Sequence, residues 1–243
     1  MKRRDFLKLM ASGLCSGIFF PSILVPGEKK REKRWAMLVD ITVCAKSKDC
    51  RACVDACHET HNVPSIGSSK EEIKWIWIST FDRVFENELP ISTKDNLSQP
   101  VILMCNHCEN PPCVKVCPTK ATWKREDGIV MMDYHRCIGC RYCMAACPYG
   151  ARSFNWRDGK PYLGKINYDF PVRAKGVVEK CNFCEERISK GLIPKCVEAC
   201  PLGALKFGDI ADPESEVSKI LKGRISMVRK PHLGTKPNVF YLL

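Results

Sequence analysis

Residues 137–148 read Cys-Ile-Gly-Cys-Arg-Tyr-Cys-Met-Ala-Ala-Cys-Pro, so two, two and three residues separate four successive cysteines, and a proline follows the last. Two other stretches repeat this arrangement with a wider middle gap. They run from Cys105 through Cys108 and Cys113 to Cys117-Pro118, and from Cys181 through Cys184 and Cys196 to Cys200-Pro201. An alanine stands three residues after each proline. The stretches therefore form an internal repeat.

A fourth cysteine group lies nearer the N-terminus and follows the repeat less closely. It consists of Cys44, Cys50, Cys53 and Cys57. Five residues separate Cys44 from Cys50, where the repeat has two, and His58 stands where the other groups have proline. Together the groups hold sixteen of the chain's seventeen cysteines, which make up about 7% of its 243 residues. This content is far above ordinary usage and must be explained before any other feature.

The spacing of residues 137–148 is typical of bacterial 4Fe-4S cluster sites. In such a run three thiolates hold one cluster, whereas the fourth, on a short helix that the proline ends, ligates a different cluster. The groups are therefore expected to work in pairs. All sixteen grouped cysteines are predicted iron ligands of four 4Fe-4S clusters, or of three if the Cys44 group is defective. His58 and His61 are alternative ligands there, although surface or supporting positions on a helix suit them better.

Other uses of cysteine fit this pattern less well. Zinc prefers two separated cysteine pairs in a tetrahedral site, whereas here three cysteines fall within seven residues. A lone redox-active C-x2-C pair would not recur with such partners. Disulfide frameworks are typical of short secreted chains with scattered cysteines. A cysteine-rich zinc-binding interaction protein is kept as an alternative function.

Residues 1–27 predict an export signal. A basic head, Lys2-Arg3-Arg4-Asp5-Phe6-Leu7-Lys8, precedes a mostly apolar run to Val25. The head resembles the twin-arginine motif of exported folded proteins, which suits a cofactor inserted before export. The apolar run is also near the ~20 residues of a membrane anchor, so a cleaved signal and a retained anchor are both open. Cys15 within it is assigned no role. The expected location is the outer (periplasmic) face of the cytoplasmic membrane.

The formal charge of +12 at pH 7 would by itself suggest a nucleic-acid or anionic membrane partner. Four clusters with their thiolates would each contribute about −2, and the segment to Gly27 accounts for +3. The mature protein with its cofactors is then near neutral. Nucleic acid is therefore excluded from the expected partners.

The cysteine motifs resemble those of a known family. Residues 105–118, residues 137–148 and Cys181-Asn182-Phe183-Cys184 resemble the four-cluster iron-sulfur subunits of the dimethyl sulfoxide reductase superfamily, and the resemblance covers about residues 34–209. Within that family, the leader and residues 57–62 and 70–75 look most like the DsrO subunit of the sulfite-reduction-associated membrane complex. The resemblance implies that the first cysteine group pairs with the fourth and the second with the third. The implied ligand sets are Cys44, Cys50, Cys53 and Cys200; Cys181, Cys184, Cys196 and Cys57; Cys105, Cys108, Cys113 and Cys147; and Cys137, Cys140, Cys143 and Cys117.

The resemblance also implies a function. The chain is expected to be an electron-transfer subunit of a hetero-oligomeric respiratory complex of sulfate or sulfite metabolism. It would relay single electrons between an integral membrane, quinone-reactive subunit and another redox subunit such as a cytochrome c. An electron-transfer subunit of a molybdenum or tungsten oxidoreductase is the alternative. No Ser-His-Asp set, phosphate-binding glycine loop or carboxylate pair stands out in the sequence, so the chain itself is expected to catalyse no bond-making reaction.

The expected fold class is α+β, with two interleaved ferredoxin-like modules that each hold two 4Fe-4S clusters. Strands are predicted at residues 35–41, 74–79, 101–104 and 129–132, and short helices after Cys53, Cys113, Cys143 and Cys184. The predicted divisions are a signal or anchor at 1–27, a double iron-sulfur domain at 34–209, and a C-terminal helix and tail at 210–243. That helix is expected to begin at the Asp212-Pro213 cap and to end near Gly223. Stretches 86–99 and 155–174 are predicted insertions, either docking segments or ordinary surface loops.

Overall fold

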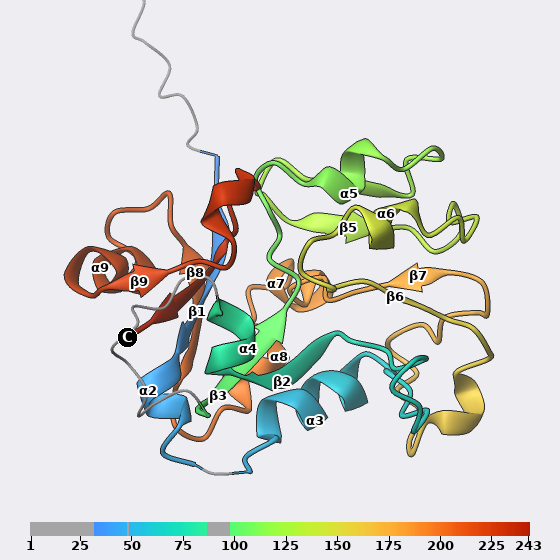
Figure 1. Ribbon diagram of the computed structural model, residues 1–243, viewed down its shortest axis with the longest axis horizontal. Coiled ribbons are helices and arrows are strands. Elements are labelled where there is room, and N and C mark those ends of the chain that lie inside the picture. Colours follow the sequence, from blue (N-terminus) through green and yellow to red (C-terminus); the bar gives the residue numbers. More distant parts are fainter. Residues whose placement is uncertain (1–31, 48, 87–97) are drawn as a thin grey trace, which may run out of the picture. The chain divides into compact units, whose positions relative to one another are not determined.

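The computed structural model describes residues 32–47, 49–86 and 98–243, which belong to one compact unit (Figure 1). The predicted signal at residues 1–27 lies outside the described residues, as does most of the predicted insertion at 86–99. Among the residues that are described, no helix is both long and apolar enough to cross a membrane. Helices and strands are mixed along the chain, in agreement with the expected α+β class.

The largest sheet has four strands in the order β8-β1-β10-β9. These strands are β1 (Trp35–Asp40), β8 (Leu205–Asp209), β9 (Ser226–Met227) and β10 (Val239–Leu242). Strand β1 pairs in parallel with β10, with Met37 opposite Val239, and antiparallel with β8, with Met37 opposite Phe207. The C-terminal segment therefore adds strands to the sheet that contains the first described strand.

Strand β1 is buried on both faces because it separates two apolar clusters. Met37 and Val39 belong to the main core, whereas Leu38 joins a smaller core around Val217. Successive side chains of a strand point to opposite faces. The nearly continuous apolar run of β1 is what two covered faces require.

Helix α9 (Glu216–Gly223) covers β8 and β1. The hydroxyl of Ser215 caps it by accepting a hydrogen bond from the Ser218 N–H at 3.2 Å. The start predicted at Asp212 is wrong by three residues, because the Asp212 carboxylate accepts from the Glu214 N–H in a preceding turn instead. The end at Gly223 is as predicted.

Three antiparallel pairs of strands make up the remaining sheets of the described chain. They are β2 (Ile76–Thr80) with β3 (Pro100–Met104), β4 (Thr122–Lys124) with β5 (Val130–Met132), and β6 (Ser153–Phe154) with β7 (Val178–Glu179). The four strands predicted from the sequence are all present, with ends that differ by at most two residues.

Short helices carry or adjoin the cysteines. They are α2 (Ile41–Cys44), α3 (Ala52–Thr60), α5 (Pro112–Lys115), α6 (Tyr142–Ala145), α7 (Glu185–Ile188) and α8 (Lys195–Glu198), and α4 (Phe81–Phe85) follows β2. The helices expected at Cys53, Cys113, Cys143 and Cys184 are present, and α8 precedes Cys200-Pro201, where the repeat also places a short helix. Helices α2 and α4 were not predicted. Helix α3 contacts α8, and α5 contacts α6. Figure 1 shows these two helix pairs in different parts of the unit.

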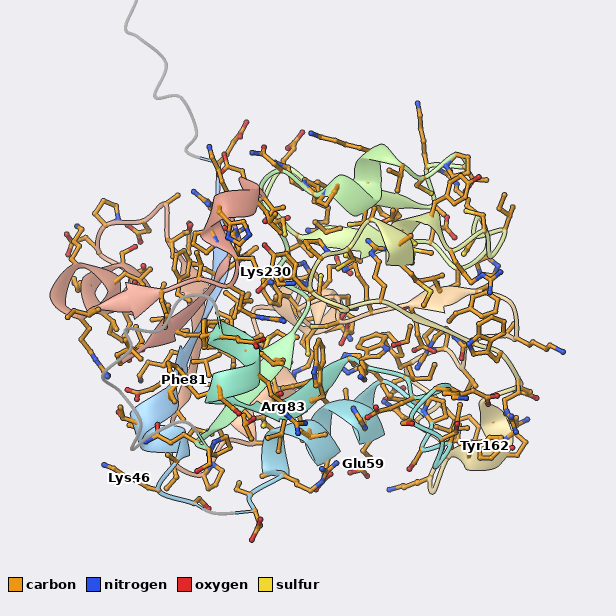
Figure 2. All side chains as sticks on the ribbon, viewed as in Figure 1. Lys46, Glu59, Phe81, Arg83, Tyr162 and Lys230 are labelled. Carbon is orange, nitrogen blue, oxygen red and sulfur yellow. The ribbon has the colours of Figure 1, made fainter. Side chains whose placement is uncertain are left out.

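The predicted insertion at residues 155–174 is held against the end of α3. The Asn62 amide donates to the carbonyls of Asn167 at 2.7 Å and Phe170 at 2.6 Å, and its oxygen accepts from the Asn167 N–H at 2.8 Å. Tyr162, labelled in Figure 2, ends a 3-10 turn (Lys160–Tyr162) in this insertion. The insertion is thus part of the folded body.

Candidate metal centres

Four cysteines from both ends of the described chain line one pocket. They are Cys44, Cys50, Cys53 and Cys200. We name it the Cys44 pocket. Cys44 is the last residue of α2, and Cys53 lies on α3. Cys50 directly precedes Arg51, the N-cap of α3, so the two helices and the residue before the second one all reach the pocket.

A second pocket is lined by Cys105, Cys108, Cys113 and Cys147. We name it the Cys105 pocket. Cys105 directly follows β3, Cys113 lies on α5, and Cys147 comes two residues after α6. The contact between α5 and α6 brings Cys147 to this loop.

A third group, the Cys181 pocket, consists of Cys57, Cys181, Cys184 and Cys196. All four are buried, with exposed fractions between 4% and 8%. Burial raises the pKa of the Cys57 thiol well above its ordinary value, and the nearby Cys181, Cys196 and Cys184 raise it further. Cys57 on α3 reaches Cys196 on α8 because these helices contact each other.

The fourth group, the Cys137 pocket, joins Cys117 to the loop that carries Cys137, Cys140 and Cys143. Burial is the largest cause that raises the pKa of Cys143, and Cys137 and Cys117 add to it. Cys140 is assigned to this group because it lies on the same loop, between Cys137 and Cys143. Cys140 is exposed, whereas every other described cysteine is buried or half-buried.

The structure therefore brings fifteen of the sixteen described cysteines together in the combinations that the family resemblance implies, whereas Cys140 is joined to its group by the sequence. In each pocket, three cysteines come from one sequence group and one from another. All sixteen described cysteines are free thiols. Their role as iron ligands stays a prediction.

The donor sets fit a group that takes four thiolates. Burial, followed by Cys44, Cys200 and Cys50, raises the pKa of Cys53 to about 12. Burial and neighbouring cysteines also raise the pKa of Cys108 and of Cys181 to about 12. Crowded, buried thiols stay protonated without a positive centre, and metal ligation requires thiolates. A centre containing iron is the kind of group that reconciles these two conditions.

Asn106 gives a second indication of fit. Its side chain lines the Cys105 pocket, is 1% exposed, and has no hydrogen-bond partner for either polar atom among the described residues. A buried amide without a partner is costly and calls for an explanation. Sulfur atoms of an iron-sulfur cluster accept hydrogen bonds, so a bound cluster would give the Asn106 amide an acceptor.

Two buried basic residues adjoin the pockets and were missed by the sequence analysis. Arg152 Nη2 donates to Cys113 Sγ at 3.1 Å and to Thr122 Oγ1 at 2.8 Å. Lys180 Nζ donates to the Cys181 carbonyl at 2.7 Å and to the Val130 carbonyl. The sequence offered one signal for these two residues, which is their position next to cysteines. Arg152 follows Cys147 by five residues, and Lys180 directly precedes Cys181.

The two histidines proposed as alternative ligands do not line the Cys44 pocket. His61 Nε2 donates to Glu186 Oε1 at 2.9 Å, and its Nδ1 lies 3.6 Å from Cys57 Sγ. The ligand atoms of His61, Cys184 and Glu186 lie within 4.8 Å of one another. Because Cys184 belongs to the Cys181 pocket, this group is part of that pocket's surroundings. His58 Nε2 faces the Ile76 carbonyl at 3.2 Å.

Comparison with known proteins assigns the family. Residues 100–169 and 161–210 match the 4Fe-4S dicluster domain. The Hdr-like menaquinol oxidoreductase iron-sulfur subunit 1 of Archaeoglobus fulgidus is 43% identical over 99% of this chain and 97% of its own length. The chain belongs to the family of 4Fe-4S dicluster iron-sulfur subunits.

Other members of this family match over most of the chain as well. The iron-sulfur cluster-binding subunit of the menaquinone reductase of Nitratidesulfovibrio vulgaris is 36% identical over 88% of this chain and 90% of its own length. The B subunit of the polysulfide reductase of Wolinella succinogenes is 36% identical over 86% and 93%. Members are electron-transfer subunits of quinone and molybdoenzyme oxidoreductase complexes. The prediction of an electron-transfer subunit with 4Fe-4S clusters is confirmed at this level.

Proposed function

We propose that the chain holds four 4Fe-4S clusters and relays single electrons between a quinone-reactive membrane subunit and another redox subunit, such as a cytochrome c. Each cluster, when bound, takes up and releases one electron. The observation that supports the proposal is the gathering of fifteen cysteines into four sets, the last of which Cys140 completes from the same loop. The relatives named for menaquinol oxidation and menaquinone reduction support the quinone-reactive partner.

The proposed ligand sets are the four pockets, and they imply two interleaved modules. Cys57 and Cys200 are exchanged between the first and fourth sequence groups, and Cys117 and Cys147 between the second and third. The contact of α3 with α8 supports the outer module, and that of α5 with α6 the inner one. One module is then inserted in sequence within the other.

Backbone donors already face three of the proposed ligand sulfurs. The N–H groups of Val178, Phe183 and Lys195 donate to Cys137 Sγ at 3.5 Å, Cys181 Sγ at 3.4 Å and Cys184 Sγ at 3.3 Å respectively. Such bonds are stronger when the sulfur carries negative charge. These donors therefore favour the thiolate form that iron ligation needs.

We place electron exchange with one partner at the Cys137 pocket. Cys140 is exposed there, and the adjacent Ile138 and Tyr142 are 67% and 62% exposed. Exposed basic residues, Lys115 and Arg136, lie on the contacting α5 and on the same loop. An apolar centre with a basic rim fits a partner subunit that presents an apolar spot with acidic residues around it.

We propose that the protein is exported by the twin-arginine route and acts on the outer face of the cytoplasmic membrane. The basic head at residues 2–8 supports the route, and the resemblance to the DsrO subunit supports a complex of sulfur respiration. A second candidate, a subunit of a molybdenum or tungsten oxidoreductase, is supported by the polysulfide reductase relative. Co-purification with a pterin-containing chain would decide for the second candidate.

The first test measures iron and acid-labile sulfide per chain on full-length protein purified without oxygen. Four cubane clusters give about sixteen of each. About twelve would indicate an incomplete Cys44 pocket and leave the electron-transfer function intact. Bound zinc with negligible sulfide would contradict the proposal.

The same protein tests the exchange of cysteines between groups. Cys57→Ser and Cys184→Ser are expected to alter the same electron paramagnetic resonance signal, because both residues belong to the Cys181 pocket. Cys50→Ser, in the sequence group of Cys57, is the matched control and should alter a different signal. If Cys57→Ser alters the signal that Cys50→Ser alters, the interleaved arrangement is wrong.

A further inference from the structure

Two buried cations, Arg152 and Lys180, lie beside the pockets. Arg152 is 4% exposed and Lys180 is 1% exposed. Among the described residues, neither forms an ion pair with an aspartate or a glutamate. Arg173 is equally buried, at 3%, but forms an ion pair with the buried Glu179 at 2.6 Å. Within the described part of the chain, a carboxylate therefore balances the charge of Arg173 but not that of Arg152 or Lys180.

Arg152 lies between two of the pockets. Its Nη2 is 3.1 Å from Cys113 Sγ of the Cys105 pocket. Its Nη1 is 3.7 Å from Met132 Sδ, and Met132 packs in the same apolar cluster as Cys143 of the Cys137 pocket, whose pKa the guanidinium lowers. Burial disfavours the charged guanidinium, but Cys113, Cys143 and Cys105 outweigh it and raise the pKa of Arg152. The guanidinium therefore lies between cysteine residues of the Cys105 pocket and of the Cys137 pocket.

Lys180 lies between another two pockets, the Cys105 pocket and the Cys181 pocket. Its ammonium donates to the carbonyls of Val130 and Cys181, which anchor it beside the Cys181 pocket. Burial lowers the pKa of Lys180, and Cys105 is the largest influence that opposes this, ahead of Cys181. Val130 lines the Cys105 pocket, so the ammonium lies between a residue of that pocket and Cys181 of the Cys181 pocket.

Burying a cation is strongly unfavourable unless an anion compensates it. The described neighbours of the two cations include cysteine sulfurs, which carry negative charge only as thiolates, and a 4Fe-4S cluster with four thiolates carries about −2. The positions of the two cations therefore match the negative charge that the filled pockets would carry. This match of charge concerns the reduction potentials of the filled pockets, and not only the geometry of their ligands.

We propose that Arg152 and Lys180 are charge-compensating residues at two successive junctions of the relay. Arg152 serves the junction between the Cys137 and Cys105 pockets, and Lys180 serves the one between the Cys105 and Cys181 pockets. Each stabilises an added electron in both pockets that it adjoins. The inference rests on the proposed ligand sets. It follows that the Cys105 pocket, which both cations adjoin, depends on them most.

The test is a redox titration of the full-length protein, purified without oxygen and followed by electron paramagnetic resonance. Arg152→Gln and Lys180→Gln keep hydrogen-bond donors but remove the charge. Each is expected to lower the potentials of two one-electron steps, changing the reduced-to-oxidised ratio at fixed potential at least tenfold, which is 59 mV. The double variant should shift three steps, with the largest shift in the step common to both single variants. Arg157→Gln, which removes a 47% exposed arginine paired with Glu71, is the control and should shift none.

The outcomes separate this inference from the proposed function. Wild-type protein without iron and sulfide would contradict the proposed function itself. Full iron and sulfide content with unshifted steps in both glutamine variants would overturn only the inference. If a glutamine variant loses a cluster, Arg152→Lys and Lys180→Arg decide the matter, because they keep the charge. Retention of clusters and potentials in these variants supports charge compensation, whereas the same loss in them shows that shape is required and overturns it.

Discussion

At the scale of single residues, Asp40 connects the stability of the fold to the position of a predicted ligand. Its carboxylate caps α2 by accepting from the Val43 N–H at 3.0 Å, and it also accepts from Thr42 Oγ1 at 2.8 Å and from Arg224. Cys44 is the last residue of the same helix. Burial raises the pKa of Asp40, but the bonds from Arg224, Val43 and Thr42 together hold it below its ordinary value.

We expect Asp40→Ala to lower the free energy of unfolding at pH 7 by about 1–2 kcal/mol, the usual cost of a lost helix cap. Asp40→Asn keeps a capping oxygen and should cost less, because Arg224 is 39% exposed and water screens its charge. The folded pKa lies below that of the unfolded chain, near 3.9. The carboxylate therefore stabilises the fold above about pH 4, and this contribution is lost as the pH falls through the folded pKa.

Denaturant unfolding of wild type and Asp40→Asn at a series of pH values checks this prediction. The difference between them should stay constant from pH 8 to about 5 and close below about pH 4. Asp55→Asn removes a carboxylate that is 68% exposed and should change stability by less than about 0.5 kcal/mol. A difference that grows toward low pH would contradict the assignment of Asp40.

Single residues also show where sequence reasoning reaches its limit. The sixteen cysteines were predictable because thiolates at fixed short spacing are tied to one chemistry. Arg152 and Lys180 were not, because they are two of 39 basic residues and nothing local distinguishes a buried cation from an exposed one. Their function depends on sulfur atoms that come from distant groups.

At the scale of elements, the loop of the Cys137 pocket is fixed by a close approach of two backbones. A Cβ on Gly139 would lie 2.3 Å from the Gly176 carbonyl oxygen, and Gly139 has φ +69°. Gly150 has a similar φ of +63° but nothing within 4 Å of its Cβ position. The two glycines therefore separate the cost of backbone conformation from the cost of a clash.

Gly150→Ala should destabilise the protein by about 1–2 kcal/mol, because alanine is strained at positive φ. Gly139→Ala should cost about 1–3 kcal/mol more, since the segment around Gly176 must move. Thermal unfolding and iron content of both variants measure this. If the two variants are equally stable, the segment around Gly176 moves without cost, and its close contact with Gly139 does not fix the loop.

Elements differ in how far the sequence could predict them. The strands near residues 35, 74, 101 and 129 were visible as apolar runs beside the cysteine groups. Helices α2 and α4 were not, because four or five residues show no helical periodicity and neither helix lies within the three repeated cysteine runs that place α5, α6, α7 and α8. Strand β10 was not predicted, because its parallel partner, β1, lies about 200 residues away in the chain.

At the scale of the whole molecule, the pairing of cysteine groups was open from spacing alone. The repeat predicts that groups exchange their last cysteine, but any two groups satisfy that rule. The choice came from the family resemblance. In the structure it is accompanied by two helix contacts between distant segments, α3 with α8 and α5 with α6, which no local pattern encodes.

The proposed docking face at the Cys137 pocket gives the prediction that concerns the molecule as part of a complex. Ile138→Asp replaces a side chain that is 67% exposed and is expected to leave stability nearly unchanged. It should slow quinol-driven reduction of the protein in its native membrane complex roughly tenfold, since loss of an apolar anchor costs about 1–2 kcal/mol. Lys115→Glu on α5 should also slow it, through repulsion from an acidic rim.

Salt distinguishes the two effects, because the screening length falls from about 10 Å at 0.1 M to about 3 Å at 1 M. The defect of Lys115→Glu should shrink at high salt, whereas that of Ile138→Asp should persist. Lys219→Glu is the control, since this exposed lysine lies on α9, which covers β8 and β1 (Figure 1). Rates that are unchanged in Ile138→Asp, or lowered as much in Lys219→Glu as in Lys115→Glu, would show that the partner docks elsewhere.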